Sequence, residues 1–186
     1  MTQNEKVEKA YSGLLGAEIV VKKGRKGHNV IALATAKVKR EPSEKKLEWA
    51  KQLRKASQYA KNALAIPELR EMYTKLSSKE IPPYRVASND FLQKPVIDSL
   101  DHSGYRGNIG DTITVSAIDK VGITSVTATL TAQDGTLIET GPCVHNLPTS
   151  NYTYTATCDV PAIGGMVLRI EVTDIPGNKV AKTMTL

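Results

Sequence analysis

The chain has 186 residues, of which 40% are hydrophobic, and a formal net charge of +6. This length allows one or two domains with a modest core, and the composition indicates a globular protein rather than a disordered or fibrous one. The apolar runs are a few residues long, against the roughly 20 needed to cross a bilayer, so we expect no membrane span. The polar N-terminus predicts no secretory signal, and we expect synthesis in the cytoplasm, with the final location left open.

The charge is unevenly divided along the chain. Residues 1–93 carry 19 Lys/Arg and 10 Asp/Glu, whereas residues 94–186 carry 6 and 9. The hydrophobic pattern changes at the same place, from helical spacing to strict alternation. Both changes predict a domain boundary near Lys94–Pro95, with a basic β-hairpin and helical module at 1–94 and an all-β domain at 95–186.

The first forty residues combine a helical pattern with two β-prone runs. Residues 3–15 place apolar side chains at helical spacing and predict a short helix. The runs 17–21 and 29–33 are rich in β-branched residues, and 22–27 between them supplies two glycines and four cations. This arrangement predicts a β-hairpin with a basic tip.

Three helices are predicted next. Ser43 is a suitable N-cap for a helix over 44–64, which should end before Pro67 because a residue preceding proline is pushed out of the α region. Pro67 can itself begin a second helix that reaches 77–78, and a third is expected over 85–92. The apolar side predicted for the long helix comprises Leu47, Ala50, Leu53, Ala60 and Leu64, widened by Trp49, Ala56 and Ala63.

The pattern apolar-x-apolar-x-apolar-x-Asp-x-x-Gly occurs twice, at 113–122 and 168–177. Its alternating apolar positions share one face of a strand, and the Asp and Gly suit the turn that follows. Further short alternating runs, with a hairpin signal at Asp134–Gly135, predict a β-sandwich. The expected strands are 96–100, 112–117, 123–131, 137–140, 152–158, 166–172 and 180–185. The expected core is Ile113, Val115, Ala117, Val126, Leu130, Leu168, Ile170 and Val172.

These motifs, in this order, resemble bacterial immunoglobulin-like domains over the last half of the chain. They are the segment 113–122, the alternating run 125–130, Asp134–Gly135, Tyr152 with Tyr154, and the closing segment 172–178. The position at which such modules often carry a Trp is Tyr152 here. The first half resembles a basic helical segment that precedes such modules in uncharacterised bacterial proteins. The resemblance implies a spacer, an adhesive module or a decoration of an assembly, and fold alone does not choose among these.

The strongest candidate for a binding surface is the segment 22–61, which holds 13 Lys/Arg against three Glu. Clustered cations can meet an acidic protein, a self-assembly surface or the phosphates of nucleic acid, or can be a solvated face. The candidate residues are Lys22, Lys23, Arg25, Lys26, Lys37, Lys39, Arg40, Lys51, Arg54, Lys55 and Lys61.

The sequence offers little for catalysis or metal binding. His28, His102 and His145 are scattered, and neither metal-ligand spacings nor nucleophile or phosphate-loop motifs occur. A calcium site could draw on Asp98, Asp101, Asp119 and Asp174, but two of these already have a turn-stabilising explanation. We therefore expect a protein that is not an enzyme, with no cofactor, metal or small-molecule substrate.

The cysteines Cys143 and Cys158 are the only two in the chain. A hairpin loop at 147–151 would place them opposite one another, or nearly so, at a distance close to disulfide reach. The absence of a secretory signal favours free thiols, because the cytosol is reducing. Both states of this cysteine pair are left open.

Taken together, the sequence predicts a non-enzymatic structural or interaction protein. Its basic module would dock onto a partner or an assembly and display the immunoglobulin-like domain, for example in a phage particle or another bacterial assembly. The alternative hypothesis is a nucleic-acid-binding protein that grips phosphates with the segment 22–61.

Overall fold

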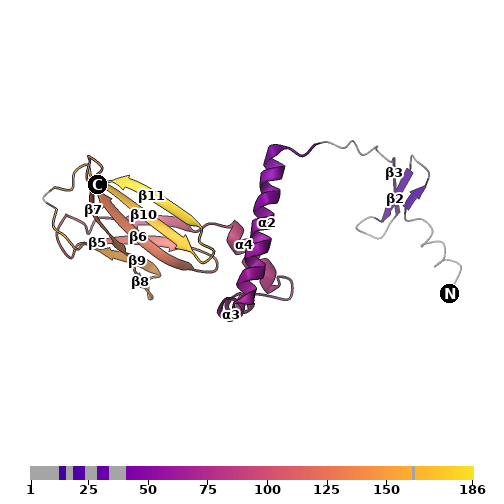
Figure 1. Ribbon diagram of the computed structural model, residues 1–186, viewed down its shortest axis with the longest axis horizontal. Coiled ribbons are helices and arrows are strands. Elements are labelled where there is room, and N and C mark those ends of the chain that lie inside the picture. The colour runs from indigo at the N-terminus through magenta and orange to yellow at the C-terminus, as the bar shows by residue number, and fades with distance from the viewer. Residues whose placement is uncertain (1–12, 16–18, 24–28, 34–40, 161) are drawn as a thin grey trace. The chain divides into compact units, whose positions relative to one another are not determined.

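The computed structural model describes residues 13–15, 19–23, 29–33, 41–160 and 162–186. The chain forms two compact units, 1–43 and 44–186 (Figure 1). Each unit is described by itself below. The predicted boundary at 94/95 lies inside the second unit, and separability at that point stays a prediction.

The described part of the first unit is a three-stranded antiparallel sheet in the order β1-β2-β3. Strands β2 (Ile19–Lys23) and β3 (Asn29–Leu33) pair in register from Ile19–Leu33 to Lys23–Asn29, which confirms the predicted hairpin. Strand β1 (Gly13–Leu15) pairs with β2, so the helix predicted over 3–15 is wrong at its C-terminal end. Strand pairing outweighs helical spacing in so short a segment. The rest of that predicted helix, and the hairpin tip at 24–28, lie outside the described residues.

The second unit begins with three helices, α2 (Glu44–Ala65), α3 (Pro67–Lys75) and α4 (Pro83–Leu92), close to the three that were predicted. Prolines set two of the starts. Ile66 and Pro82 are extended, with ψ of 120° and 158°, because each precedes a proline that occupies the first turn of the next helix. The helices pack on one another through Ala56, Ala60 and Ala63 of α2, Tyr73 of α3 and Ala87 of α4.

The apolar side predicted for α2 is buried over only part of its length. Leu47, Trp49 and Leu53 are 49%, 55% and 43% exposed, whereas Ala56 and Ala60 are fully buried. At 1.5 Å per residue, the 22 residues of α2 span about 33 Å and the 10 of α4 about 15 Å. The partner helices are therefore too short to cover the N-terminal half of α2.

The remainder of the second unit is a β-sandwich-like pair of four-stranded antiparallel sheets (Figure 1). One sheet has the order β4-β5-β9-β8 and the other β11-β10-β6-β7. Every predicted strand is present, β9 is shorter than predicted, and β8 is an additional short strand. The bounds are β4 Val96–Asp101, β5 Thr112–Ile118, β6 Ile123–Thr131, β7 Leu137–Pro142, β8 Val144–Asn146, β9 Asn151–Thr155, β10 Val167–Asp174 and β11 Lys179–Thr185.

The core of the sandwich lies between the two sheets and contains all eight predicted core residues. Strand β10 illustrates the alternation, because Leu168, Ile170 and Val172 are fully buried while Arg169 between them is exposed. The hairpin at Asp134–Gly135 also forms: Asp134 Oδ1 accepts the N–H of Thr136, and Gly135 has a φ of +87°. The alternating pattern therefore predicted the register correctly.

The two repeats of the sequence pattern become strands β5 and β10, each followed by a turn that its aspartate stabilises. Asp119 Oδ1 accepts the N–H groups of Val121 and Gly122, both at 2.9 Å. Asp174 Oδ1 accepts the N–H of Asn178 at 2.6 Å. The two turns differ in the role of glycine, because Gly177 has a φ of +88° and Gly122 is not in the left-handed region.

These two turns also meet the helices. The side-chain amide of Asn178 donates to the carbonyls of Phe91 and Gln93 at 3.2 and 2.9 Å, and Val121 packs against the helical core. The repeated strand–turn pattern therefore builds the end of the sandwich on which the helices rest.

The predicted opposition of the two cysteines is wrong. The paired positions of β8 and β9, such as Val144 and Thr153, total 297, whereas Cys143 and Cys158 total 301. Cys143 lies where the chain leaves β7 for β8, and its N–H still donates to the carbonyl of Val126 in β6, the strand paired with β7. Cys158 lies beyond the end of β9, and both thiols are free.

Candidate functional site

Four of the predicted basic residues lie on helix α2. Lys51, Arg54, Lys55 and Lys61 are all exposed. Lys51, Arg54 and Lys55 are neighbours on the helix surface because residues three and four apart share a face. Within the described part of the chain, none of the four forms an ion pair with an acidic side chain. They are therefore available to an acidic partner.

The other predicted cations belong to the first unit. The backbone of Lys22 and Lys23 lies at the end of β2. The remaining residues, Arg25, Lys26, Lys37, Lys39 and Arg40, lie outside the described residues. Convergence of all eleven cations on one surface stays a prediction.

The N-terminal half of α2 also exposes large apolar side chains, which the sequence had assigned to a core. Trp49 precedes Ala56 by two helical turns, so it lies on the side of α2 that is buried further along the helix. Leu53, four residues after Trp49, is exposed on the same side, whereas Leu47 is exposed on the opposite side of the helix, which it shares with Lys51 and Arg54. We call this part of the helix the free half of α2. It comprises the apolar residues Leu47, Trp49 and Leu53 and the cations Lys51, Arg54 and Lys55. An exposed Trp with a neighbouring exposed Leu, on a helix whose opposite side carries unpaired cations, is typical of a protein-binding surface rather than of a solvated one.

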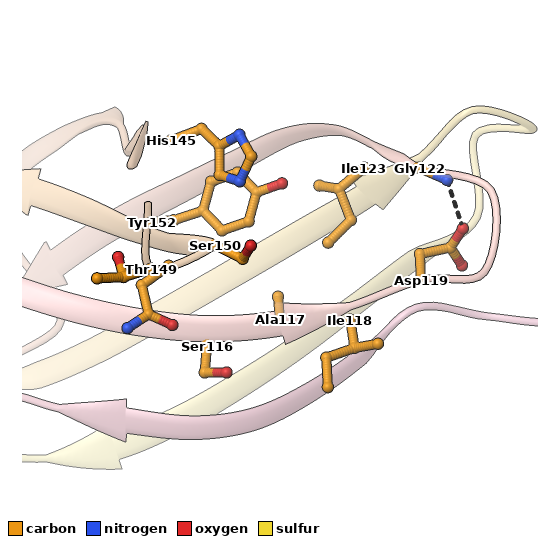
Figure 2. A pocket seen from close by; sticks show the side chains of 11 residues that line it. Ser116, Ala117, Ile118, Asp119, Gly122, Ile123, His145, Thr149, Ser150 and Tyr152 are labelled. Carbon is orange, nitrogen blue, oxygen red and sulfur yellow. Dashed lines mark hydrogen bonds between the residues drawn. The ribbon is translucent and has the colours of Figure 1, made fainter. Parts of the chain in front are cut away.

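A groove of about 580 Å³ lies in the sandwich, between the end of β5, the turn after it and the β8–β9 hairpin (Figure 2). The rings of His145 and Tyr152 stack at a centroid distance of 4.6 Å and an angle of 21°, forming one wall. Asp119 lines the groove near the turn. Burial raises the pKa of the Tyr152 hydroxyl, which therefore stays protonated and can donate a hydrogen bond at neutral pH. The sequence did not predict this groove, because distant strands form it.

Of the histidines and aspartates singled out in the sequence, those that the structure describes are spread over loops, strands and turns. His102 lies in the β4–β5 loop and His145 in β8, while His28 is outside the described residues. Asp119 and Asp174 each accept backbone N–H groups in turns, as the turn explanation predicted. In 41–160 and 162–186 no three His, Cys, Asp or Glu side chains come together in a way that could hold a metal ion.

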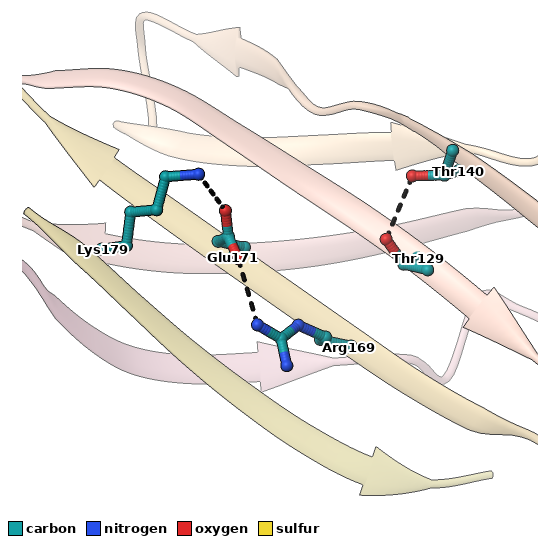
Figure 3. A network of polar contacts seen from close by, with 5 residues as sticks. All are labelled: Thr129, Thr140, Arg169, Glu171 and Lys179. Atoms are coloured by element: carbon teal, nitrogen blue, oxygen red, sulfur yellow. Dashed lines mark hydrogen bonds and ion pairs between the residues drawn. The ribbon is translucent and has the colours of Figure 1, made fainter. Parts of the chain in front are cut away.

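The outer face of the second sheet carries a small charged network (Figure 3). Glu171 bonds Lys179 at 2.8 Å and Arg169 at 3.1 Å, and these cations lower the pKa of its carboxyl group. Nearby, the hydroxyls of Thr129 and Thr140 lie 3.0 Å apart. Because both cations of this network are paired with Glu171, this face offers less to an acidic partner than the unpaired cations of the free half of α2 do.

Asp90 is a buried carboxyl group that sequence reasoning missed. It is 4% exposed, and its Oδ2 accepts the O–H of Tyr73 at 2.7 Å. Since that bond uses the only hydroxyl proton of Tyr73, the 2.8 Å bond between Tyr59 and Tyr73 must be donated by Tyr59. Burial raises the pKa of Asp90 to about 6, opposed by the Tyr73 bond and reinforced by the carboxylates of Asp119 and Asp174.

Comparison with known proteins adds no assignment. No protein-family model matches the chain, and no curated protein matches it. None of the helices in the described residues is long and apolar enough to cross a membrane. Any function must therefore be argued from the surfaces of the protein itself, chiefly the free half of α2 and the groove beside β5.

Proposed function

We propose that this chain is a non-enzymatic interaction protein that uses the free half of α2 to dock onto an acidic partner protein and so holds its β-sandwich in a larger assembly. The observation that carries the proposal is that this half of the helix exposes Trp49 and Leu53 on one side, and Leu47 with Lys51, Arg54 and Lys55 on the other. Trp and Arg are enriched at the centres of protein interfaces, where they contribute most of the binding free energy.

Charge and apolarity together favour an acidic protein over the other occupants of this surface. Phosphate neutralisation by nucleic acid needs the cations and makes no use of exposed Leu and Trp side chains. Two copies of α2 laid against each other would bring their unpaired cations together, and like charges repel. An acidic partner whose apolar groove encloses the free half of α2 would meet the apolar side and the cationic side together, in the manner of a helix in a groove.

The sandwich is proposed to be immunoglobulin-like. Its strand orders, β4-β5-β9-β8 and β11-β10-β6-β7, correspond to the A-B-E-D and G-F-C arrangement of such domains with one added edge strand. The chain departs from antibody domains in having free cysteines away from strands β5 and β10, and no Trp in the core. A domain of this kind suits display or spacing, which agrees with the docking role.

The experiment uses Trp49 as a reporter, because it is the only Trp in the chain. The full-length protein is titrated with a helical peptide that carries Leu on one face and Glu on the other, and with a duplex of about 20 base pairs. We expect the peptide to shift the Trp49 emission to the blue as the ring leaves water. The duplex should not produce this shift.

Matched variants locate the binding. The triple variant Lys51→Glu, Arg54→Glu, Lys55→Glu should lose peptide binding, whereas Lys79→Glu, Lys94→Glu, Lys182→Glu makes the same change of charge elsewhere and should retain it. Tight duplex binding with a steep dependence on salt would instead support the nucleic-acid alternative. Absence of binding to either probe at low salt would rule out docking through α2.

A further inference from the structure

Strand β5 extends beyond its partner β9. β5 runs from Thr112 to Ile118, but its register with β9 covers only the four pairs from Thr112–Thr155 to Val115–Tyr152. On its other side, β5 remains paired with β4 as far as Ile118. Residues 116–118 of β5 therefore have a strand partner on the side of β4 but none on the side of β9, where their edge is open.

Hydrogen-bond alternation identifies which backbone groups face this open edge. The N–H of Ala156 donates to the carbonyl of Asp111 at 2.8 Å, and the groups that point toward one neighbour recur at every second residue of an antiparallel strand. Ile113, Val115 and Ala117 thus direct their N–H and C=O toward β9. The residue that would oppose Ala117 is Ser150, which has a φ of +54° and lies outside the strand.

The groove of Figure 2 occupies the place that β9 would have filled. Ser116, Ala117 and Ile118 form its floor from β5, and the stacked His145 and Tyr152 form a wall. Its volume of about 580 Å³ is within the range of roughly 300–1,000 Å³ that is usual for ligand sites.

The charge of the groove restricts the ligand. Asp119 is the only residue among its lining that is formally charged at neutral pH with histidine taken as neutral, and it uses Oδ1 for the two bonds in its turn. The other carboxylate oxygen, Oδ2, can accept a bond from a cation. Because no Lys or Arg lines the groove, a phosphate or another anion would find no fixed cation there and would meet the carboxylate of Asp119.

We propose that this groove binds a short extended peptide carrying a Lys or Arg, which pairs with the Ala117 edge of β5 as an added strand and places its cation at Asp119. Strand addition draws its affinity from backbone hydrogen bonds and its selectivity from alternate side chains. The proposal concerns the sandwich alone and is independent of docking through α2.

The test is a titration of the ¹⁵N-labelled full-length protein with acetyl-Val-Thr-Val-Lys-amide, followed by amide chemical shifts. We expect saturable shifts centred on Ala117 and its neighbours, with a dissociation constant on the order of 0.1–1 mM for so small a contact. Methylation of the peptide's backbone amides should abolish binding, because a methylated nitrogen cannot donate. Replacement of the peptide's Lys by Glu should weaken binding several-fold.

Variants of the protein separate the parts of the site. His145→Ala removes part of the wall and should weaken binding. Asp119→Asn keeps the Oδ1 acceptor of the turn but removes the charge, so it should abolish the preference for Lys over Glu. Thr129→Ala, on the outer face of the other sheet, should leave binding unchanged.

Three results would overturn the proposal. They are equal binding of the methylated peptide, shifts that lie away from β5, and no saturable shift up to several times the expected dissociation constant. A further titration with glucose distinguishes another occupant, since shifts at Ala117 caused by the sugar and not by the peptide would make the groove a carbohydrate site. Loss of peptide binding in the α2 triple variant would also contradict the independence of the two sites.

Discussion

The replacement Asp90→Asn tests the electrostatics of the helical core. Asp90 has a pKa of about 6 in the folded protein against an ordinary value of 3.8, chiefly because its carboxyl group is buried. At roughly 1.36 kcal/mol per pKa unit, this difference corresponds to about 3 kcal/mol. Asn is neutral and of similar shape, and its side-chain carbonyl can still accept the O–H of Tyr73.

The sign of the pH dependence follows from the raised pKa. Well below pH 3.8, Asp90 is protonated in both the folded and the unfolded state and contributes no penalty. Above about pH 7 it is ionised in both, and the buried carboxylate then destabilises the folded state by about 3 kcal/mol. Ionisation of Asp90 therefore lowers the free energy of unfolding as the pH rises from 4 to 7.

The assay is urea unfolding of the wild type and Asp90→Asn at several values between pH 4 and 7.5, followed by circular dichroism. The free energy of unfolding of the variant minus that of the wild type should rise by about 2–3 kcal/mol across this range, whatever its value at pH 4. Taking this difference cancels the titration of other groups. Tyr73→Phe removes the hydroxyl that donates to the Asp90 carboxylate and should raise the pKa of Asp90 further. The free energy of unfolding of this variant should therefore fall more steeply with pH than that of the wild type. A difference between wild type and Asp90→Asn that does not change with pH would refute this reasoning.

Three further predictions concern the sandwich. Leu168→Ala should cost about 2–5 kcal/mol of unfolding free energy in urea melts, whereas Arg169→Ala should cost within about 0.5, and the reverse order would mean that the register is wrong. Gly177→Ala should destabilise by about 1 kcal/mol because its φ is +88°, while Gly164→Ala, which has open space and no such φ, should be neutral or slightly stabilising. A fragment of residues 93–186 should melt cooperatively with an all-β spectrum, and an insoluble or molten product would contradict the boundary at 94/95.

Much of the local structure could be predicted from the sequence because its causes are local. Pro67 both ends α2 and begins α3, through steric effects on its immediate neighbours. The alternation of Leu168, Ile170 and Val172 sets which face of β10 is buried, since side chains alternate across a strand. Asp119 and Asp174 stabilise turns by bonding backbone groups two to four residues away.

The candidate sites depended on contacts between distant parts of the chain, and the sequence did not reveal them. Periodicity marks the apolar side of α2 but not how far α3 and α4 extend along it, so Trp49 was assigned to a core and is exposed. The chain crosses from one sheet to the other at Cys143, between β7 and β8, and β8 then pairs with β9 with Val144 opposite Thr153, a register that loop length did not reveal.

The amino-acid sequence by itself therefore determined the three helices of residues 44–92, most of the strands with their apolar faces, and where most turns fall. Only the tertiary structure decided that Trp49 and Leu53 remain exposed, that the Asp90 carboxyl group is buried, and that β9 ends before β5 does. The physical reason is range: propensity, alternation and turn chemistry act over a few residues, whereas burial and strand partnership are set by elements tens of residues apart.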